Sequence, residues 1–244
     1  MATAHPDKLA GPVVLAIETA GLCGSIALVT PGQCLGELSI NTRGTHSKRL
    51  LQSINWLLTQ TELDWPDIAA IAVSLGPGSF TGLRIGLSTV KGICMATGKP
   101  LLGVSSLDGL ACQFPYLPQQ ICAIIDARKK EIYTAFYRNS EQGTAIRTSD
   151  YRVMAPENLP ALIDEATILV GDGAKLYENF FRKELAEQAC FAPAELHFAR
   201  AAAIGFLGLA QLQQGEFIEA ATAVPIYIRA SDAELEFDKK KKRD

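Results

Sequence analysis

Histidine is scarce in this sequence: the only three are His5, His46 and His197, and no H-x-x-x-H or H-E-x-x-H pair occurs. The six cysteines are scattered and form no C-x-x-C pair. These absences argue against a zinc site built from His and Cys ligands. Several of the cysteines lie in apolar segments, as buried free thiols do, which favours a reducing compartment.

Long apolar runs are also missing. The most apolar windows are interrupted by Gly, Lys or Arg well before about 18 residues, the length that a membrane-spanning helix needs. The start, MATAHPDKLAGPV, lacks the apolar stretch of a signal peptide. We therefore expect neither secretion nor membrane insertion, and we predict a cytoplasmic protein.

An excess of positive charge is absent as well. The 244 residues are 48% hydrophobic and 20% charged with a formal charge of −3, which is typical of a globular chain of one large or two small domains. The end, KKKKRD, is a local basic tail. A solvated end is favoured over an RNA-binding segment there, because like charges repel one another and bury nothing.

A weak internal repeat organises the chain. The segment VVLAIETAGLCGSIALV from Val13 reads as a β-hairpin, and ICAIIDARKKEIYTAFY from Ile121 repeats it, with Asp126 in the place of Glu18. The first copy continues through a helix, the strand IAAIAVSLGPG and a second helix. The second copy continues through PENLPALIDEA, predicted as a helix, and TILVGDGAKLYENFF, predicted as strand, turn and helix.

Two β-β-α-β-α units of about 100 residues predict paired α/β lobes in which helices cover buried strands. We place the N-terminal lobe at 13–110 and the C-terminal lobe at 111–198. The apolar helix 199–214 is expected to dock on the first lobe, and AVPIYIR follows as a short strand or an extended arm. Residues 1–12 and 231–244 are predicted to be flexible tails.

The glycine-rich stretch SLGPGSFTGLRIG, Ser74 to Gly86, matches none of the catalytic motifs that glycines usually serve. It has no Gly-Lys pair at P-loop spacing, its G-x-G-x-x-x-G spacing misses the dinucleotide fingerprint by one residue, and Ser79 is out of register for a nucleophile elbow. Glu18 and Asp126 could hold Mg²⁺ in a two-lobed nucleotide-binding protein. The favoured interpretation is that both are turn acids that accept hydrogen bonds from nearby backbone amides.

A helix from Ser79 to Ala96 would be apolar over more than half of its circumference. Its face of large residues suits the sheet of its own lobe: Phe80, Leu83, Leu87, Val90 and Cys94. Its second face is mostly small and would let another backbone approach closely: Gly82, Gly86, Thr89, Ile93 and Ala96. That neighbour is either another polypeptide or the preceding helix of the same lobe.

The preceding helix, predicted from His46 to Gln60, has a core stripe of Leu50, Leu51, Ile54, Leu57 and Leu58. Trp56 points away from this stripe, as an interface anchor or a residue folded under a loop would. The partner interface predicted from both helices consists of Trp56, Gly82, Ile85, Gly86, Thr89 and Ile93. On this hypothesis Gly86→Arg leaves the lobe folded and abolishes partner binding.

The segments LAIETA, GPGSFTGLRIG, GVSSLDGLA, IDARKKEIYTAFY and PIYIR together resemble the bacterial TsaB (YeaZ) family, from about Val13 to Arg229. The resemblance implies an α/β fold of the actin/Hsp70/sugar-kinase (ribonuclease H-like) type, with two lobes of β-β-α-β-α units. It also implies a non-catalytic subunit required to form threonylcarbamoyladenosine beside the tRNA anticodon. Such a subunit pairs through its first two helices with the transferase subunit TsaD and activates it.

The resemblance further implies that a TsaE-like ATPase joins the complex and that tRNA is met through the complex. The apolar surface of the two helices could drive a homodimer when the partner is absent. No catalytic residue, cofactor site or metal site is predicted. TsaD-like proteins carry a histidine metal motif that this chain lacks, and Glu18 stands where many relatives have Asp, which weakens a Mg-nucleotide role. The alternative is an ATP-dependent phosphotransferase or a peptidase-like hydrolase on the same fold.

Overall fold

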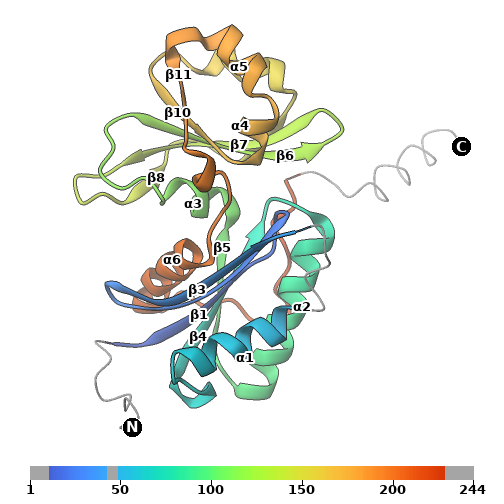
Figure 1. The fold of residues 1–244 in the computed structure, drawn as a ribbon, viewed down its shortest axis with the longest axis vertical. Coiled ribbons are helices and arrows are strands. Elements are labelled where there is room, and N and C mark those ends of the chain that lie inside the picture. The colour runs from blue at the N-terminus through green and yellow to red at the C-terminus, as the bar shows by residue number, and fades with distance from the viewer. Residues whose placement is uncertain (1–10, 43–48, 229–244) are drawn as a thin grey trace, which may run out of the picture.

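The computed structural model describes residues 11–42 and 49–228. The predicted tail at 231–244, most of the tail at 1–12, and His46 at the predicted helix start lie outside these described residues. Figure 1 shows two lobes, one above the other, each built around its own sheet.

The first sheet has the strand order β3-β2-β1-β4-β5. Strands β1, β2 and β3 pair antiparallel, whereas β4 is parallel to β1 and β5 is parallel to β4. Every residue of the central strand β1 is buried, as expected for an uninterrupted apolar strand with neighbours on both sides. The strands are β1 (Val13–Glu18), β2 (Cys23–Thr30), β3 (Gln33–Asn41), β4 (Ile68–Gly76) and β5 (Leu101–Ser105).

The second sheet has the order β11-β10-β6-β7-β8, and β9 also pairs with β7. Read from β8 to β11, the second sheet repeats the arrangement of the first sheet read from β3 to β5. The strands β6 and β7 again form an antiparallel hairpin, and β10 and β11 again run parallel to their neighbours. The predicted repeat and the predicted α/β class are therefore confirmed. The strands are β6 (Gln120–Arg128), β7 (Glu131–Asn139), β8 (Ala145–Arg147), β9 (Arg152–Met154), β10 (Thr167–Val170) and β11 (Ala189–Phe191).

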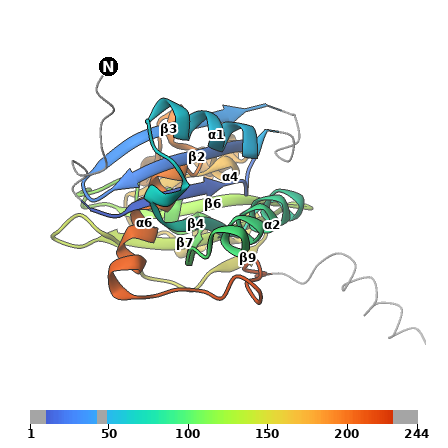
Figure 2. The same cartoon turned by 90° about the horizontal axis from the view of Figure 1, so that it is seen from below.

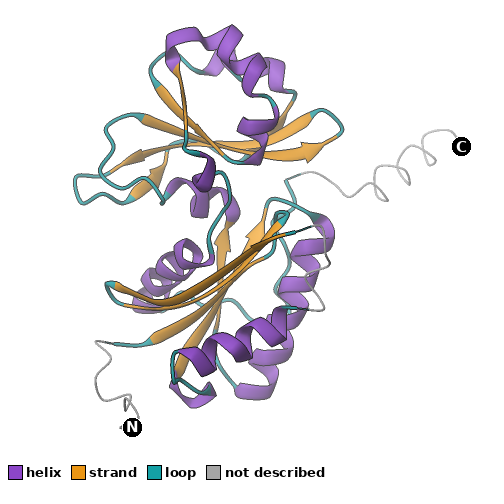
Figure 3. Ribbon diagram, in the orientation of Figure 1, coloured by secondary structure: helices purple, strands orange, loops and turns teal. Residues whose placement is uncertain are grey.

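Helices cover both faces of each sheet (Figure 3). Helices α1 (Leu50–Gln60) and α2 (Phe80–Thr97) cover one face of the first sheet, and α6 (Ala201–Gln214) covers the other. Helix α3 (Ser106–Ala111) packs on one face of the second sheet, opposite α4 (Asp172–Leu176) and α5 (Glu178–Leu185). The lobe boundaries 13–110 and 111–198 stay predictions.

Two secondary-structure predictions are corrected. Strand β3 was not predicted, because it lies at the sheet edge, is mostly half-exposed, and carries Gly36 where a side chain would crowd Leu57. The predicted helix PENLPALIDEA is instead two 3₁₀ turns, Pro156–Asn158 and Pro160–Leu162. A continuous α-helix is ruled out there because the ring of Pro160 would clash with the carbonyl of Pro156.

The turn between β6 and β7 has an unusual backbone. Arg128, Lys129 and Lys130 have φ angles of 63°, 52° and 61°, all in the left-handed region. In that region the Cβ atom of a non-glycine residue approaches a carbonyl oxygen, at a cost of roughly 1–2 kcal/mol per residue. The turn therefore holds three consecutive residues in a conformation that glycine adopts more readily.

Candidate functional site

The glycine-rich stretch connects β4 to α2 and wraps around the turn that follows β1. Ser79 is the N-cap of α2, and its Oγ accepts a hydrogen bond from the Gly82 amide at 3.2 Å. The Ser79 amide donates to the Ala20 carbonyl at 2.6 Å, and Thr19 Oγ1 donates to the Gly82 carbonyl at 2.9 Å. These hydrogen bonds fix the start of α2 to the turn that joins β1 and β2.

The glycines make this close contact possible. A Cβ atom added to Gly78 would overlap the Ala20 carbonyl, and one added to Gly82 would overlap the Thr19 carbonyl. A Cβ on Gly86 would overlap the Thr19 hydroxyl. The small-residue face of α2 therefore packs against a turn of its own lobe, which is neither of the neighbours that the sequence left open.

Three predicted interface residues are corrected on this basis. Gly82, Gly86 and Ile93 are buried inside the lobe, so they cannot meet another polypeptide unless the lobe opens. The structure argues against the expectation that Gly86→Arg leaves a folded lobe, because the arginine would have to displace Thr19. The other three, Trp56, Ile85 and Thr89, remain accessible: Trp56 is 52% exposed and the other two are half-buried.

The outer faces of α1 and α2 carry more apolar side chains than the sequence predicted. Leu51, assigned to the core stripe, is 54% exposed, and Phe80, assigned to the sheet-facing side, is 43% exposed. Met95 is 82% exposed. The sequence could have indicated this exposed side chain, because Met95 is an apolar residue on the side of the helix that otherwise holds Arg84, Ser88 and Lys91. We call the following five residues the helix-pair surface: Leu51, Trp56, Phe80, Ile85 and Met95.

Sequence reasoning missed a stack of side chains at the start of α2. The Arg84 guanidinium lies 3.7 Å from the centre of the Phe80 ring, and the Tyr227 ring lies 6.1 Å from the same ring. Tyr227 comes from the C-terminal segment that was predicted as either a short strand or an extended arm. The structure forms no strand there, in agreement with the arm. The Ile226 amide of this arm donates a hydrogen bond to the Leu75 carbonyl at 2.8 Å. The exposed face of Phe80 is therefore framed by residues far apart in the sequence.

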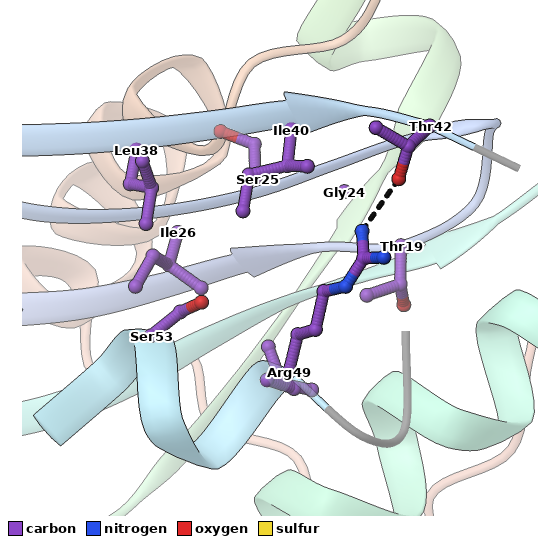
Figure 4. Close-up of a pocket in the computed structure, with 10 residues that line it drawn as sticks. Thr19, Gly24, Ser25, Ile26, Leu38, Ile40, Thr42, Arg49 and Ser53 are labelled. Atoms are coloured by element: carbon purple, nitrogen blue, oxygen red, sulfur yellow. Dashed lines mark hydrogen bonds between the residues drawn. The ribbon is translucent and has the colours of Figure 1, made fainter. Parts of the chain in front are cut away.

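A narrow pocket opens between β2, β3 and the first turn of α1 (Figure 4). Arg49 reaches across it and donates a hydrogen bond to Thr42 at 2.5 Å. The pocket has a volume of about 30 Å³. That is room for one or two water molecules, whereas sites for small organic ligands usually measure about 300 Å³ or more.

The second cavity lies between the lobes and contains a buried carboxylate. Glu18, at the end of β1, is 1% exposed, and one oxygen of its carboxylate accepts a hydrogen bond from the Ala20 amide. Its Oε2 atom has no hydrogen-bond partner among the described residues. Burial raises the pKa of Glu18 to about 7, although the Ser74 side chain and the Ala20 amide partly offset the effect.

From the second lobe, Asp172 and His197 line the same cavity. Burial raises the pKa of Asp172, and its Oδ1 accepts a hydrogen bond from the Asp126 amide at 3.0 Å. Asp126 itself accepts a hydrogen bond from the Arg128 amide at 2.8 Å. The favoured interpretation of Glu18 and Asp126 as turn acids is therefore confirmed, and the carboxylate that lines the cavity opposite Glu18 is Asp172.

This inter-lobe cavity measures about 30 Å³, and a separate open groove of about 450 Å³ shares Cys23 and Phe198 with its lining. In the groove Glu37 forms an ion pair with Arg200, and Glu195 adds another acid. Such a lining offers no basic cradle for a triphosphate. Among residues 11–42 and 49–228, no three His, Cys, Asp or Glu side chains are grouped so that they could hold a metal ion.

Comparisons with known proteins point to proteins of one tRNA modification. The family model described as TsaD, tRNA N6-adenosine threonylcarbamoyltransferase, matches residues 40–237. The chain is 28% identical over 226 residues to a protein of Bacillus subtilis (strain 168) named tRNA threonylcarbamoyladenosine biosynthesis protein TsaB, and the match covers 92% of this chain and 97% of the relative. Within the described part of the chain, no helix is long and apolar enough to cross a membrane.

Solved structures point the same way. YeaZ from Pseudomonas aeruginosa superposes with a TM-score of 0.75 and 27% identity, covering 88% of this chain and 99% of that one. Component A of the (R)-2-hydroxyglutaryl-CoA dehydratase from Acidaminococcus fermentans superposes with a TM-score of 0.50 at 10% identity, covering 83% of this chain and 100% of that one. At that identity the second likeness concerns the fold alone.

Proposed function

Because this chain belongs to the TsaB (YeaZ) family, we propose that it is a non-catalytic subunit required for threonylcarbamoyladenosine formation in tRNA, and that it binds and activates a TsaD-type transferase. The relatives' names support the pathway. The helix-pair surface supports the partner, since exposed apolar side chains on two adjacent helices are typical of an interaction site. That surface is the single observation on which the binding role rests.

The described residues also fit a subunit without chemistry of its own. The buried carboxylate of Glu18 faces a cavity of about 30 Å³, the larger groove beside it has no basic cradle for a triphosphate, and the glycine-rich stretch serves packing inside the lobe. On this proposal the catalytic groups belong to the transferase. Calorimetric titration with ATP checks the non-catalytic role, because a phosphotransferase requires nucleotide affinity in the isolated chain.

Within the predicted interface, Trp56, Ile85 and Thr89 keep their proposed role, and Leu51, Phe80 and Met95 join them. Helices α1 and α2 would pack against helices of the transferase, as apolar helix faces do when they bury each other. We further propose that a TsaE-like ATPase joins this complex, that tRNA is met through it, and that the same apolar surface supports a homodimer when the transferase is absent.

The test compares two arginine substitutions at equally exposed positions. Leu51 on α1 and Ile146 on β8 are each 54% exposed, so neither variant should impair folding. We expect Leu51→Arg to weaken binding to the transferase at least about tenfold, because a desolvated charge in an apolar interface costs more than about 1.4 kcal/mol. Ile146→Arg should bind like the wild type, as measured by calorimetry of the purified subunits.

The modification assay completes this test. Threonylcarbamoyladenosine formation on a tRNA transcript should fall in parallel with binding for Leu51→Arg and stay normal for Ile146→Arg. Normal binding by both Leu51→Arg and Met95→Arg would remove the helix-pair surface from the interface. Failure of the wild-type chain to bind the transferase would contradict the proposed function itself.

A further inference from the structure

The left-handed turn between β6 and β7 places three cations side by side. Arg128, Lys129 and Lys130 are all exposed and all have positive φ. Hairpin turns of this kind favour Gly, Asn and Asp, because those residues tolerate left-handed backbone. This chain has a long basic side chain at each of the three positions.

Solvated lysines and arginines can be placed anywhere on a surface without backbone strain. A turn that requires positive φ is one of the least favourable places for them. The sequence therefore places positive charge at this turn although the backbone conformation there disfavours lysine and arginine. Strained backbone that persists in a fold is concentrated at sites of function, so this turn calls for a functional explanation.

The turn is also held in place. Asp126 accepts the Arg128 amide at 2.8 Å and pairs with its guanidinium at 3.0 Å. The Asp126 amide in turn donates to Asp172 at 3.0 Å, which ties the end of β6 to α4. The three charges are thus presented from an anchored hairpin, and a binding partner would not have to order a loose loop.

The position of the turn suits a ligand held by the proposed complex. In Figure 1 the tip of the β6–β7 hairpin in the upper lobe and the helix α2 in the lower lobe both lie on the right-hand side of the molecule, and α2 is on that side in Figure 2 as well. The helix-pair surface includes Phe80 at the start of α2 and Met95 near its end. A substrate bound by a partner on α1 and α2 would therefore have the basic turn on its side of the chain.

From these observations we infer that the Arg128–Lys130 turn contacts the phosphate backbone of the tRNA while the transferase holds it; this inference rests on the proposed function. Asp126 offsets the charge of Arg128, so the excess positive charge of the turn comes from Lys129 and Lys130, whereas the chain as a whole carries a formal charge of −3. Arginine offers a planar fork of donors to phosphate oxygens, and lysine offers a compact charge. The contact positions the RNA and reads no sequence.

A double glycine substitution separates the charge from the fold. In the full chain, Lys129→Gly with Lys130→Gly removes two charges and relieves left-handed strain, so the unfolding temperature should stay the same or rise. The complex of this variant with the transferase should bind a tRNA transcript, bearing adenosine beside the anticodon, about tenfold more weakly in fluorescence anisotropy. The plot of log affinity against log salt concentration has a negative slope, and each lost phosphate contact should make it less steep by about 0.7–0.9.

Lys183→Gln on α5 is the control, since its side chain is 83% exposed and far along the chain from the turn. It should leave tRNA affinity and salt slope unchanged. Unchanged affinity of the double glycine variant in an intact complex would overturn the inference, and so would an equal loss with Lys183→Gln. Loss of transferase binding by the double variant would mean that the turn meets protein instead of RNA. Gel filtration of the wild-type complex tests the proposed function separately.

Discussion

Replacing Gly82 with alanine is expected to lower the free energy of unfolding by about 3 kcal/mol. The new Cβ would overlap the carbonyl oxygen of Thr19, a backbone atom that cannot rotate away. Either α2 or the turn after β1 must shift, which would also disturb the Thr19 hydroxyl that donates to the Gly82 carbonyl. Overpacking of a close contact costs typically 1–3 kcal/mol, and the lost hydrogen bond adds about 1 kcal/mol.

Gly92 provides a matched control in the same helix. A Cβ there would meet no atom within 4 Å, and the residue is exposed. Gly92→Ala should therefore stabilise the protein by about 0.5–1 kcal/mol through helix propensity alone. Urea unfolding of the two variants should give changes of opposite sign. If Gly82→Ala were as stable as Gly92→Ala, the tight packing of α2 on the Thr19 turn would be refuted.

The same comparison at Gly86 refines the argument. There the nearest atom to an added Cβ is the hydroxyl of Thr19, and a side chain can rotate where a carbonyl cannot. Gly86→Ala should consequently destabilise the protein less than Gly82→Ala. The order Gly82, then Gly86, then Gly92 follows from what each Cβ would touch.

The second large effect concerns pH. Glu18 has a pKa of about 7 in the folded protein, against 4.5 for an ordinary glutamate, because burial disfavours its charged form. The folded state therefore holds this proton more tightly than the unfolded state does. The resulting stabilisation is fully present below about pH 4.5 and is lost as pH rises through about 7. At about 1.4 kcal/mol per pKa unit, the loss is on the order of 3 kcal/mol.

Glu18→Gln removes this titration and should gain stability relative to the wild type as pH rises. Urea unfolding at pH 5 and pH 8 measures the change, and the difference between the two proteins should grow by up to about 3 kcal/mol. Glu141→Gln, at an exposed position, controls for loss of one acid. The raised pKa of Asp172 acts in the same direction and is present in both proteins. A pH-independent difference would show that Glu18 is not a buried, weakly satisfied carboxyl.

Much of the fold could be predicted from local pattern. Continuous apolar runs indicated β1, β4 and β6, and Ser79 with the apolar spacing after it indicated α2 to within one residue at each end. Strand β3 escaped prediction because an edge strand needs no strict apolar alternation and is paired on one side only. Its pairing partner β2 supplies the stability that its own sequence does not show.

The candidate site was only half predictable. Periodicity identified α1 and α2 as helices with surplus apolar surface, and it placed Trp56 away from the core, where the structure has it 52% exposed. It could not tell that Leu51 and Phe80 are exposed. The Phe80 ring contacts Tyr227 and Arg84 at the protein surface. Tyr227 lies in the C-terminal arm, which no local sequence pattern connects to α2.

The sequence by itself determined the repeated lobes, the family and the presence of a helix with one face of small residues, because hydrophobic spacing and motif order are local properties of the chain. Only the tertiary structure decided what covers that face. The contact between Thr19 and Gly82 joins residues 63 positions apart, and the carboxylate opposite Glu18 comes from the other lobe. Such neighbours are chosen by long-range packing, which the spacing of residues along a single helix does not encode.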